Sequence, residues 1–167
     1  MDSETLQAAL EREHREIDAG IEAFSSGQAQ GASAIESLTD AIRALRRHIY
    51  LEEEFLFPPM RDELAIPIGV MLREHGEIWR TLDALEDQLR KNGATTTVLD
   101  ISRELLSQLG RHNAKEEPIF YTQADSSLTP SAAARLRAFL DTGQMPDGWV
   151  CEAARTIGTG APPWVRR

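Results

Sequence analysis

The sequence predicts an all-α protein: an up-down-up-down four-helix bundle with a short C-terminal fifth helix and an irregular tail. Three observations support this fold class. Four long stretches each carry apolar residues at every third or fourth position, so each can bury one stripe as a helix does. Capping residues, glycine and proline separate these stretches. No stretch alternates apolar and polar residues for long enough to predict a strand.

The first two predicted helices have recognisable start and stop residues. The first helix runs from about residue 3 to residue 24, where Ser25-Ser26-Gly27 ends it. The second opens with Ser33-Ala34-Ile35-Glu36, a pattern in which the Ser and Glu side chains satisfy free backbone N–H groups. Pro58-Pro59 is expected to end this helix, because proline lacks an N–H donor and clashes with the preceding turn.

The third and fourth predicted helices are bounded partly by prolines. The third begins near Pro67, since proline is favoured in the first turn of a helix, and it ends at Asn92-Gly93. The fourth can begin at Thr97. Pro118 removes one backbone hydrogen bond, so we expect a kink or an early end near Glu117.

A shorter C-terminal part is expected after the bundle. Thr129-Pro130 can start a fifth helix, which Gly143 ends. Trp149 and Trp164 indicate that the irregular tail packs on something, either the bundle or a neighbouring subunit. The predicted division of the chain is therefore residues 1–122, the bundle, and residues 123–167, the fifth helix and the tail.

The composition disfavours several classes of protein. The 167 residues carry a formal net charge of −9 and a pI near 4.9, which disfavours binding to nucleic acid or to an anionic membrane. No apolar run approaches the roughly 20 residues that span a bilayer, and the polar, acidic opening is not a secretory or transit peptide. The single cysteine, Cys151, excludes an internal disulfide framework and a cysteine-based zinc site. We therefore expect a cytoplasmic protein.

Two copies of one short motif point to a binding site. His48-Ile49-Tyr50-Leu51-Glu52 and His112-Asn113-Ala114-Lys115-Glu116 both have the pattern H-x-x-x-E, and a second glutamate follows each. Residues four apart lie on one face of a helix, with their Cβ atoms about 5–6 Å apart. Each motif can therefore present an imidazole nitrogen and a carboxylate oxygen to the same small object.

The other two histidines form a second matched pair, which makes the motifs part of an internal repeat. His14 and His75 both follow a glutamate and lie 61 residues apart, because 75 − 14 = 61. The two H-x-x-x-E motifs lie 64 residues apart, because 112 − 48 = 64. Each half of the bundle therefore has one helix with a histidine and one helix with a histidine and a glutamate.

These six residues on predicted core faces predict a metal centre. A buried imidazole needs partners for its nitrogens, and an unpaired buried carboxylate costs several kcal/mol, so a cation is the natural common partner. The set is His14, His48, Glu52, His75, His112 and Glu116. Imidazole and carboxylate suit iron, zinc, manganese or cobalt, and the lack of thiolates disfavours a purely structural zinc site. Six ligands fit two ions, which two carboxylates can bridge at about 3.5–4 Å.

The pattern also differs from that of ferritin-like carboxylate sites, which use Glu-x-x-His spacing and more glutamate. It resembles the hemerythrin family, specifically bacterial hemerythrin-like proteins with HHE cation-binding domains, over roughly residues 1–122. The matching segments are Glu13-His14, His48 to Glu53 with Phe57-Pro58, Glu74-His75, and His112 to Tyr121.

The resemblance implies a site with two iron ions. Glu52 and Glu116 would bridge the irons beneath an oxo or hydroxo group. The terminal ligands would be His14 and His48 on one iron, and His75 and His112 on the other.

The chain departs from the oxygen-carrying hemerythrins in two respects. Those proteins have five histidines, two of them four apart on the third helix, whereas the positions four residues from His75 are Met71 and Trp79 here. Those proteins also use an Asp in a His-x-x-x-x-Asp spacing, where this chain has Glu one residue earlier. With one ligand fewer, an iron has another open position or borrows a carboxylate. This difference favours turnover of peroxide, nitric oxide or oxygen over reversible oxygen carriage.

Several neighbouring residues are expected to have no direct role. Adjacent residues on a helix point about 100° apart, so most of the glutamates beside the ligands should lie in solvent. They are Glu13, Glu53, Glu74 and Glu117. Tyr50 and Tyr121 could hydrogen-bond near the site or donate electrons, but we expect ordinary packing for both. We expect Trp79 to be a core residue, with the lining of a small-molecule pocket as the alternative, and Cys151 to take no part in chemistry.

Three functional hypotheses remain. The protein is a di-iron carrier or sensor of a small oxidant, a di-iron enzyme that turns over peroxide or nitric oxide, or a regulatory bundle with a structural metal and a partner-binding tail. The expected partner is a small diatomic molecule or peroxide, with no nucleic acid and no membrane, and the expected state is a monomer or a homodimer.

Overall fold

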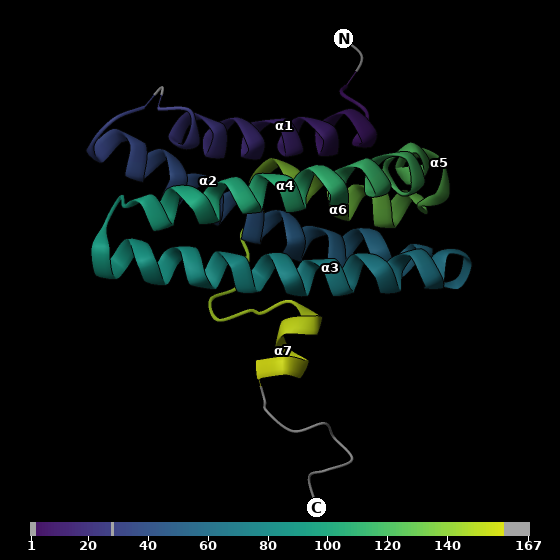
Figure 1. Cartoon of the computed structure of the whole chain (residues 1–167). Helices are drawn as coiled ribbons and strands as arrows, with labels where there is room; N and C mark the ends of the chain where they lie inside the picture. Colours follow the sequence, from purple (N-terminus) through teal and green to yellow (C-terminus); the bar gives the residue numbers. More distant parts are fainter. Residues whose placement is uncertain (1–2, 28, 159–167) are drawn as a thin grey trace, which may run out of the picture.

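The computed structural model describes residues 3–27 and 29–158, and all regular structure within these ranges is helical, as predicted. Four long helices lie alongside one another, and the α1–α2 and α3–α4 connections are at the same end (Figure 1). The long helices are α1 (Leu6–Ser25), α2 (Ala32–Leu51), α3 (Phe57–Asn92) and α4 (Thr96–Ile119). The shorter elements are η1 (Glu52–Leu56), η2 (Tyr121–Gln123), α5 (Ala124–Ser127), α6 (Pro130–Thr142) and α7 (Glu152–Gly158).

The start predicted for the second helix is wrong in detail. α2 begins at Ala32 after Gly31, which has a φ of 64° and makes no side-chain capping hydrogen bond. This left-handed conformation suits glycine and starts the helix before Ser33, which therefore lies in the first turn and does not cap it. By contrast, α4 begins one residue before the predicted Thr97, and the Thr95 side chain accepts a hydrogen bond from the backbone N–H of Val98.

The prediction that Pro58-Pro59 ends the second helix is also wrong. The chain passes from α2 through the π-helical turn η1 directly into α3, and the two prolines lie in the first turn of α3, a position that proline favours. Pro67, the predicted helix start, lies inside α3. A kink precedes it at Leu64, where φ is −121° and ψ is 32°. The helix thus resumes near Pro67 after a local break.

The ends of α4 and α6 follow from their local sequence. Pro118 lies in the last turn of α4, which ends at Ile119. The Thr129 side chain accepts a hydrogen bond from the backbone N–H of Ala132 and so caps α6, which has Pro130 as its first residue. α5 and α6 lie at the end of the molecule where α1 begins (Figure 1).

The apolar core consists of two clusters, and on α1 and α3 a histidine interrupts the apolar stripe where the clusters meet. On α1, Leu10 belongs to one cluster and Ile17 to the other, with His14 between them. On α3, Met71 and Ile78 flank His75 in the same way. The polar side chains are therefore enclosed by apolar packing on both sides along the helix axes.

The segment after α6 packs on the bundle, chiefly against α3 (Figure 1). The Trp149 ring lies 5.6 Å from that of Trp79 and 5.0 Å from that of Tyr50, and its Nε1–H donates to Glu54 at 3.2 Å. Cys151 is buried beside this contact, within the same apolar cluster as Trp79. Of the two alternatives for the tail, Trp149 therefore contacts the bundle, whereas Trp164 lies outside the described residues.

None of the helices in residues 3–27 and 29–158 is both long enough and apolar enough to cross a membrane.

Candidate metal centre

The six residues predicted as metal ligands lie together in the middle of the bundle. They form two overlapping groups, and within each group one ligand atom per residue lies within 4.8 Å of all the others. Subsite 1 consists of His14, His48, Glu52 and Glu116. Subsite 2 consists of Glu52, His75, His112 and Glu116. The two glutamates belong to both subsites, and all six side chains are buried.

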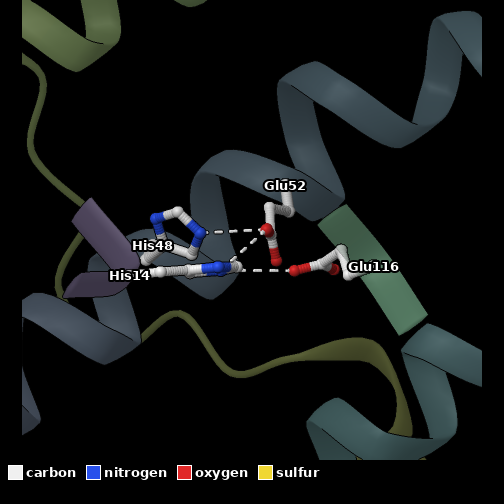
Figure 2. Close-up of side chains that lie close together, drawn as sticks. All are labelled: His14, His48, Glu52 and Glu116. Atoms are coloured by element: carbon white, nitrogen blue, oxygen red, sulfur yellow. Dashed lines mark hydrogen bonds and ion pairs between the residues drawn. The ribbon is translucent and has the colours of Figure 1, made fainter. Parts of the chain in front are cut away.

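Subsite 1 brings two imidazoles against two carboxylates (Figure 2). His48 Nε2 lies 2.9 Å from Glu52 Oε1, and His14 Nε2 lies 3.3 Å from Glu116 Oε1 and 3.9 Å from Glu52 Oε1. The histidines come from α1 and α2, and Glu116 comes from α4. Glu52 comes from η1, so the side chains of four helical elements converge on one small volume.

Subsite 2 repeats this arrangement with the other oxygen of each carboxylate. His75 Nε2 lies 3.1 Å from Glu52 Oε2 and 3.9 Å from Glu116 Oε2. His112 Nε2 lies 3.3 Å from Glu116 Oε2. Each glutamate thus directs Oε1 toward subsite 1 and Oε2 toward subsite 2, which is the geometry required of a carboxylate shared by two cations.

A π-helical turn explains how two adjacent glutamates can both face the interior. η1 begins at Glu52, and the backbone N–H of Phe57 donates to the carbonyl of Glu52, five residues earlier. The wider turn changes the rotation between successive residues, so Glu52 and Glu53 are both buried, with 1% and 8% of their surface exposed. Such turns are frequent at functional sites, and this one places two carboxylates where an ordinary helix would bury one.

The expectation that the glutamates beside the ligands lie mostly in solvent is wrong. Each of them reaches the Nδ1 atom of a site histidine on a neighbouring element, because its side chain is long enough to span the helix interface. The pairs are Glu13 with His48 at 2.8 Å, Glu53 with His75 at 3.0 Å, Glu74 with His112 at 3.1 Å, and Glu117 with His14 at 3.0 Å. We call these four glutamates the outer carboxylates. Their signal in the sequence is that they belong to the repeat, because each is adjacent to one of four ligands: His14, Glu52, His75 and Glu116.

The outer carboxylates fix the tautomer of each histidine. An ionised carboxylate only accepts hydrogen bonds, so each Nδ1 carries a proton and donates it to the carboxylate. The opposite nitrogen, Nε2, then faces the two shared glutamates. This arrangement orients the imidazole and increases its basicity as a metal ligand.

Three of the outer carboxylates are themselves held by another group. Arg47 Nη1 donates to Glu13 at 2.7 Å, and the Lys115 ammonium pairs with Glu74. The backbone N–H of Glu152 donates to Glu53 Oε2 at 3.1 Å, which connects subsite 2 with the start of α7. The network around the histidines therefore extends to the surface and to the C-terminal segment.

The close pairing of histidines and glutamates shifts the pKa values of both. Burial alone would raise the pKa of Glu13, but hydrogen bonds and charge from His48 and Arg47 lower this pKa to about 2. Burial alone would lower the pKa of His112, yet Glu116 and Glu74 raise it to about 10. Burial would likewise raise the pKa of Glu52 and Glu116, but the neighbouring histidines lower it, which favours the ionised form that binds cations.

Tyr121 lies inside the site, so the expectation that it serves only packing is wrong. Its hydroxyl oxygen lies 2.7 Å from His14 Nε2 and 2.8 Å from His48 Nε2. It also lies 2.5 Å from Glu52 Oε1, to which it donates, and 3.2 Å from Glu116 Oε1. Burial, followed by the charges of these two carboxylates, raises the pKa of Tyr121 well above its usual range. No spacing rule in the sequence connects this tyrosine with the histidines.

The residues present fit a pair of metal ions. In subsite 2, His75 Nε2 and Glu116 Oε2 are buried; they lie 3.1 Å from Glu52 Oε2 and 3.3 Å from His112 Nε2, but neither contact with these described residues has hydrogen-bond geometry. Buried polar atoms are rarely left without partners, and a cation held by nitrogen and oxygen donors satisfies both. Met71 and Trp79, at the positions where a fifth histidine was considered, lie in the apolar clusters and offer no such donor.

Fold and site together define a helical protein with a histidine and carboxylate cation-binding centre. The comparison with protein families agrees, because the family model of the hemerythrin HHE cation binding domain matches residues 5–124. The chain therefore belongs to the hemerythrin HHE cation-binding domain family. A search of curated proteins and a search of solved structures gave no match.

Proposed function

We propose that the protein is a di-iron hemerythrin-like protein that binds or turns over a small oxidant, namely oxygen, peroxide or nitric oxide, in sensing or stress defence. The observation that carries this proposal is the sharing of Glu52 and Glu116 by two four-residue groups. A site for a single ion has no need of both oxygens of two buried carboxylates. Two such bridges hold a pair of ions about 3.5–4 Å apart.

In this proposal each half of the site holds one iron. His14 and His48 bind one ion, and His75 and His112 bind the other. The ion pair, when bound, supplies the redox chemistry that the side chains lack. The protein orients the imidazoles through the outer carboxylates, and the two apolar clusters restrict the access of water to the site.

The proposal includes the finer architecture predicted from the sequence. α1 to α4 are taken as an up-down-up-down four-helix bundle and α6 as the short fifth helix, as a monomer or a homodimer. The close packing of α1 with α2 and of α3 with α4 supports this arrangement. It also explains why the two halves of the repeat face each other across the site.

The alternative of a partner-binding tail has less support from the contacts. Of the two tail tryptophans that suggested it, Trp149 packs against Trp79 and Tyr50 of the same chain, and Trp164 lies outside the described residues. A purely structural metal site is also disfavoured. Structural zinc sites usually have thiolate ligands, and the two groups of residues contain only histidine and glutamate.

The test begins with protein purified aerobically from iron-supplemented cells. We expect about two irons per chain and an oxo-to-iron charge-transfer absorption in the visible spectrum. Iron well below this content, with no such absorption, would refute the proposal.

Stopped-flow mixing then separates a carrier or sensor from an enzyme. The reduced protein is mixed with oxygen, with nitric oxide and with peroxide in separate experiments. The absence of a fifth histidine leads us to expect many cycles of peroxide or nitric oxide turnover. A reversible oxygen adduct with no turnover would refute the enzymatic version and retain the carrier.

A further inference from the structure

The two subsites differ at one pair of equivalent positions. Tyr121 and Phe57 are 64 residues apart, because 121 − 57 = 64, which is the offset that relates His112 to His48. The Tyr121 ring lies 5.0 Å from the His14 ring, and the Phe57 ring lies 5.7 Å from the His75 ring. Each half of the repeat thus places an aromatic ring beside the lone histidine of a helix, but only one of these rings carries a hydroxyl.

The hydroxyl of Tyr121 lies at distances typical of neighbouring ligands of one ion. First-row metals bind imidazole nitrogen and carboxylate oxygen at about 2.0–2.2 Å, so adjacent donors at right angles are about 3 Å apart. The Tyr121 oxygen is between 2.5 and 3.2 Å from one donor atom of each of the four residues of subsite 1. A hydroxyl that served packing alone would not need to lie this close to four donors.

No other hydroxyl oxygen within residues 3–27 and 29–158 takes the equivalent place in subsite 2. The ring of Phe57 stacks on that of His75 at an interplanar angle of 17° and has no polar atom to offer. The buried atoms without hydrogen-bond partners among the site residues, His75 Nε2 and Glu116 Oε2, both belong to this subsite. In subsite 1, the Tyr121 hydroxyl already contacts His14, His48 and Glu52.

We propose that Tyr121 is a fifth protein ligand of subsite 1, bound through its phenolate oxygen, and that the two ions are therefore inequivalent. This inference rests on the proposed function. When the ion binds, the phenol O–H bond breaks, a metal–oxygen bond forms, and the proton is released to solvent, as is usual when metals bind protein ligands. Subsite 1 then has five protein donors, and subsite 2 has four.

The test uses the fact that the chain has two tyrosines, Tyr50 and Tyr121. Tyr50 is half-buried and packs against Phe55, Phe139 and Trp149, so Tyr50→Phe is a matched control. Iron-loaded full-length wild type, Y121F and Y50F are compared by resonance Raman spectroscopy and by iron analysis. We expect phenolate vibrations enhanced in a tyrosinate-to-iron band in the wild type and in Y50F, and their loss in Y121F with about two irons retained.

The wild type and Y50F decide the question even if Y121F does not fold. Phenolate vibrations that survive in Y50F must come from the other tyrosine. Wild-type protein with two irons and no phenolate vibrations would overturn this inference and leave the di-iron proposal intact. Vibrations lost in Y50F but kept in Y121F would also overturn it. Failure of the wild type to bind iron would instead refute the proposed function itself.

Discussion

The two halves of the repeat reach the same ligand geometry through different backbone structures. In the first half the chain continues after Glu52 through the π-helical turn η1 into α3. In the second half Pro118 precedes the end of α4, and η2 follows. Both halves nevertheless bury a glutamate four residues after a histidine and direct its neighbour to a histidine on another element. The spacing of the donors is thus preserved, whereas the connection that follows is free to differ.

The halves also differ in how firmly their outer carboxylates are held. Glu13 is bound by Arg47, which also donates to the carbonyls of Phe139, Leu140 and Gly143 at the end of α6. Its counterpart Glu74 is bound by Lys115, which is exposed. The two glutamates are equally buried, but one is held by an arginine that also binds the end of α6 and the other by an exposed lysine.

The largest expected effect is on metal content, and it distinguishes a ligand shared by both subsites from a ligand of one subsite. Glu116→Ala should lose metal from both subsites, because this carboxylate directs one oxygen to each. His48→Ala and His112→Ala should each keep about one ion per chain, since each removes a donor from a single subsite. Metal analysis after dialysis measures the difference, with the exposed Glu104→Ala as the control on α4.

Full iron occupancy in both histidine variants would show that the ligand assignment is wrong. Retention of one tightly bound ion by Glu116→Ala would show that the two subsites do not depend on a common bridge.

The next effect tests the outer carboxylates as equivalent groups. Glu13→Gln and Glu74→Gln each replace an ionised acceptor of a histidine proton with a neutral amide. We expect each to lower metal affinity by about 10–100-fold, the usual cost of losing such a partner. Competition with a chelator measures both variants. Unchanged affinity in both would mean that the glutamates do not orient the histidines.

A smaller effect, on the free energy of unfolding, should distinguish Arg47 from Lys115, the residues that hold Glu13 and Glu74. Arg47→Ala removes hydrogen bonds to Glu13 and to the end of α6, so it should lower the free energy of unfolding by about 2–3 kcal/mol. Lys115→Ala removes a single ion pair whose lysine is exposed, and it should cost about 0–1 kcal/mol. Urea denaturation of the metal-free variants gives both values. Equal losses would contradict the claimed difference between the halves.

The last expected effect is on stability and concerns the packing of the C-terminal segment on α3. A Cβ on Gly76 would lie 2.7 Å from the Cβ of Ala153, so Gly76→Ala must displace α7 or α3 and should cost about 1–3 kcal/mol. Gly110→Ala, where no atom lies within 4 Å of the added Cβ, should instead stabilise the protein by up to about 1 kcal/mol.

Alkylation of the Cys151 thiol measures the displacement of α7 independently of stability. Burial raises the pKa of this thiol to about 11, so alkylation near pH 8 should be slow in the wild type and faster in Gly76→Ala. Equal rates of alkylation in Gly76→Ala and Gly110→Ala would show that α7 does not depend on close contact at Gly76.

The helical class of the fold and the six inner residues could be predicted because both are periodic. Apolar stripes identify the helices, and a histidine that interrupts a stripe at His14 or His75 identifies an inward polar group. The path of the chain after Glu52 could not be read in this way. Pro58-Pro59 suits the first turn of a helix as well as the end of one, and the π-helical turn leaves no periodic signal.

The remaining site residues depend on contacts between helices. The rule that adjacent helical residues point apart holds for Glu13 and His14, but it does not show that Glu13 reaches His48 on α2. Tyr121 enters the site only because the chain turns after Ile119, through Phe120 and η2. Tertiary packing decides such contacts, and the repeat offered the one indication of them, since each outer carboxylate has a counterpart in the other half.

The most direct test of two metal positions in one shared cage is anomalous diffraction from crystals of the iron-loaded protein at the iron absorption edge. Two peaks are expected about 3.5–4 Å apart, one within reach of His14 and His48 and the other within reach of His75 and His112. A single peak between the four histidines, or a peak outside this cage, would contradict the assignment of two subsites that share Glu52 and Glu116.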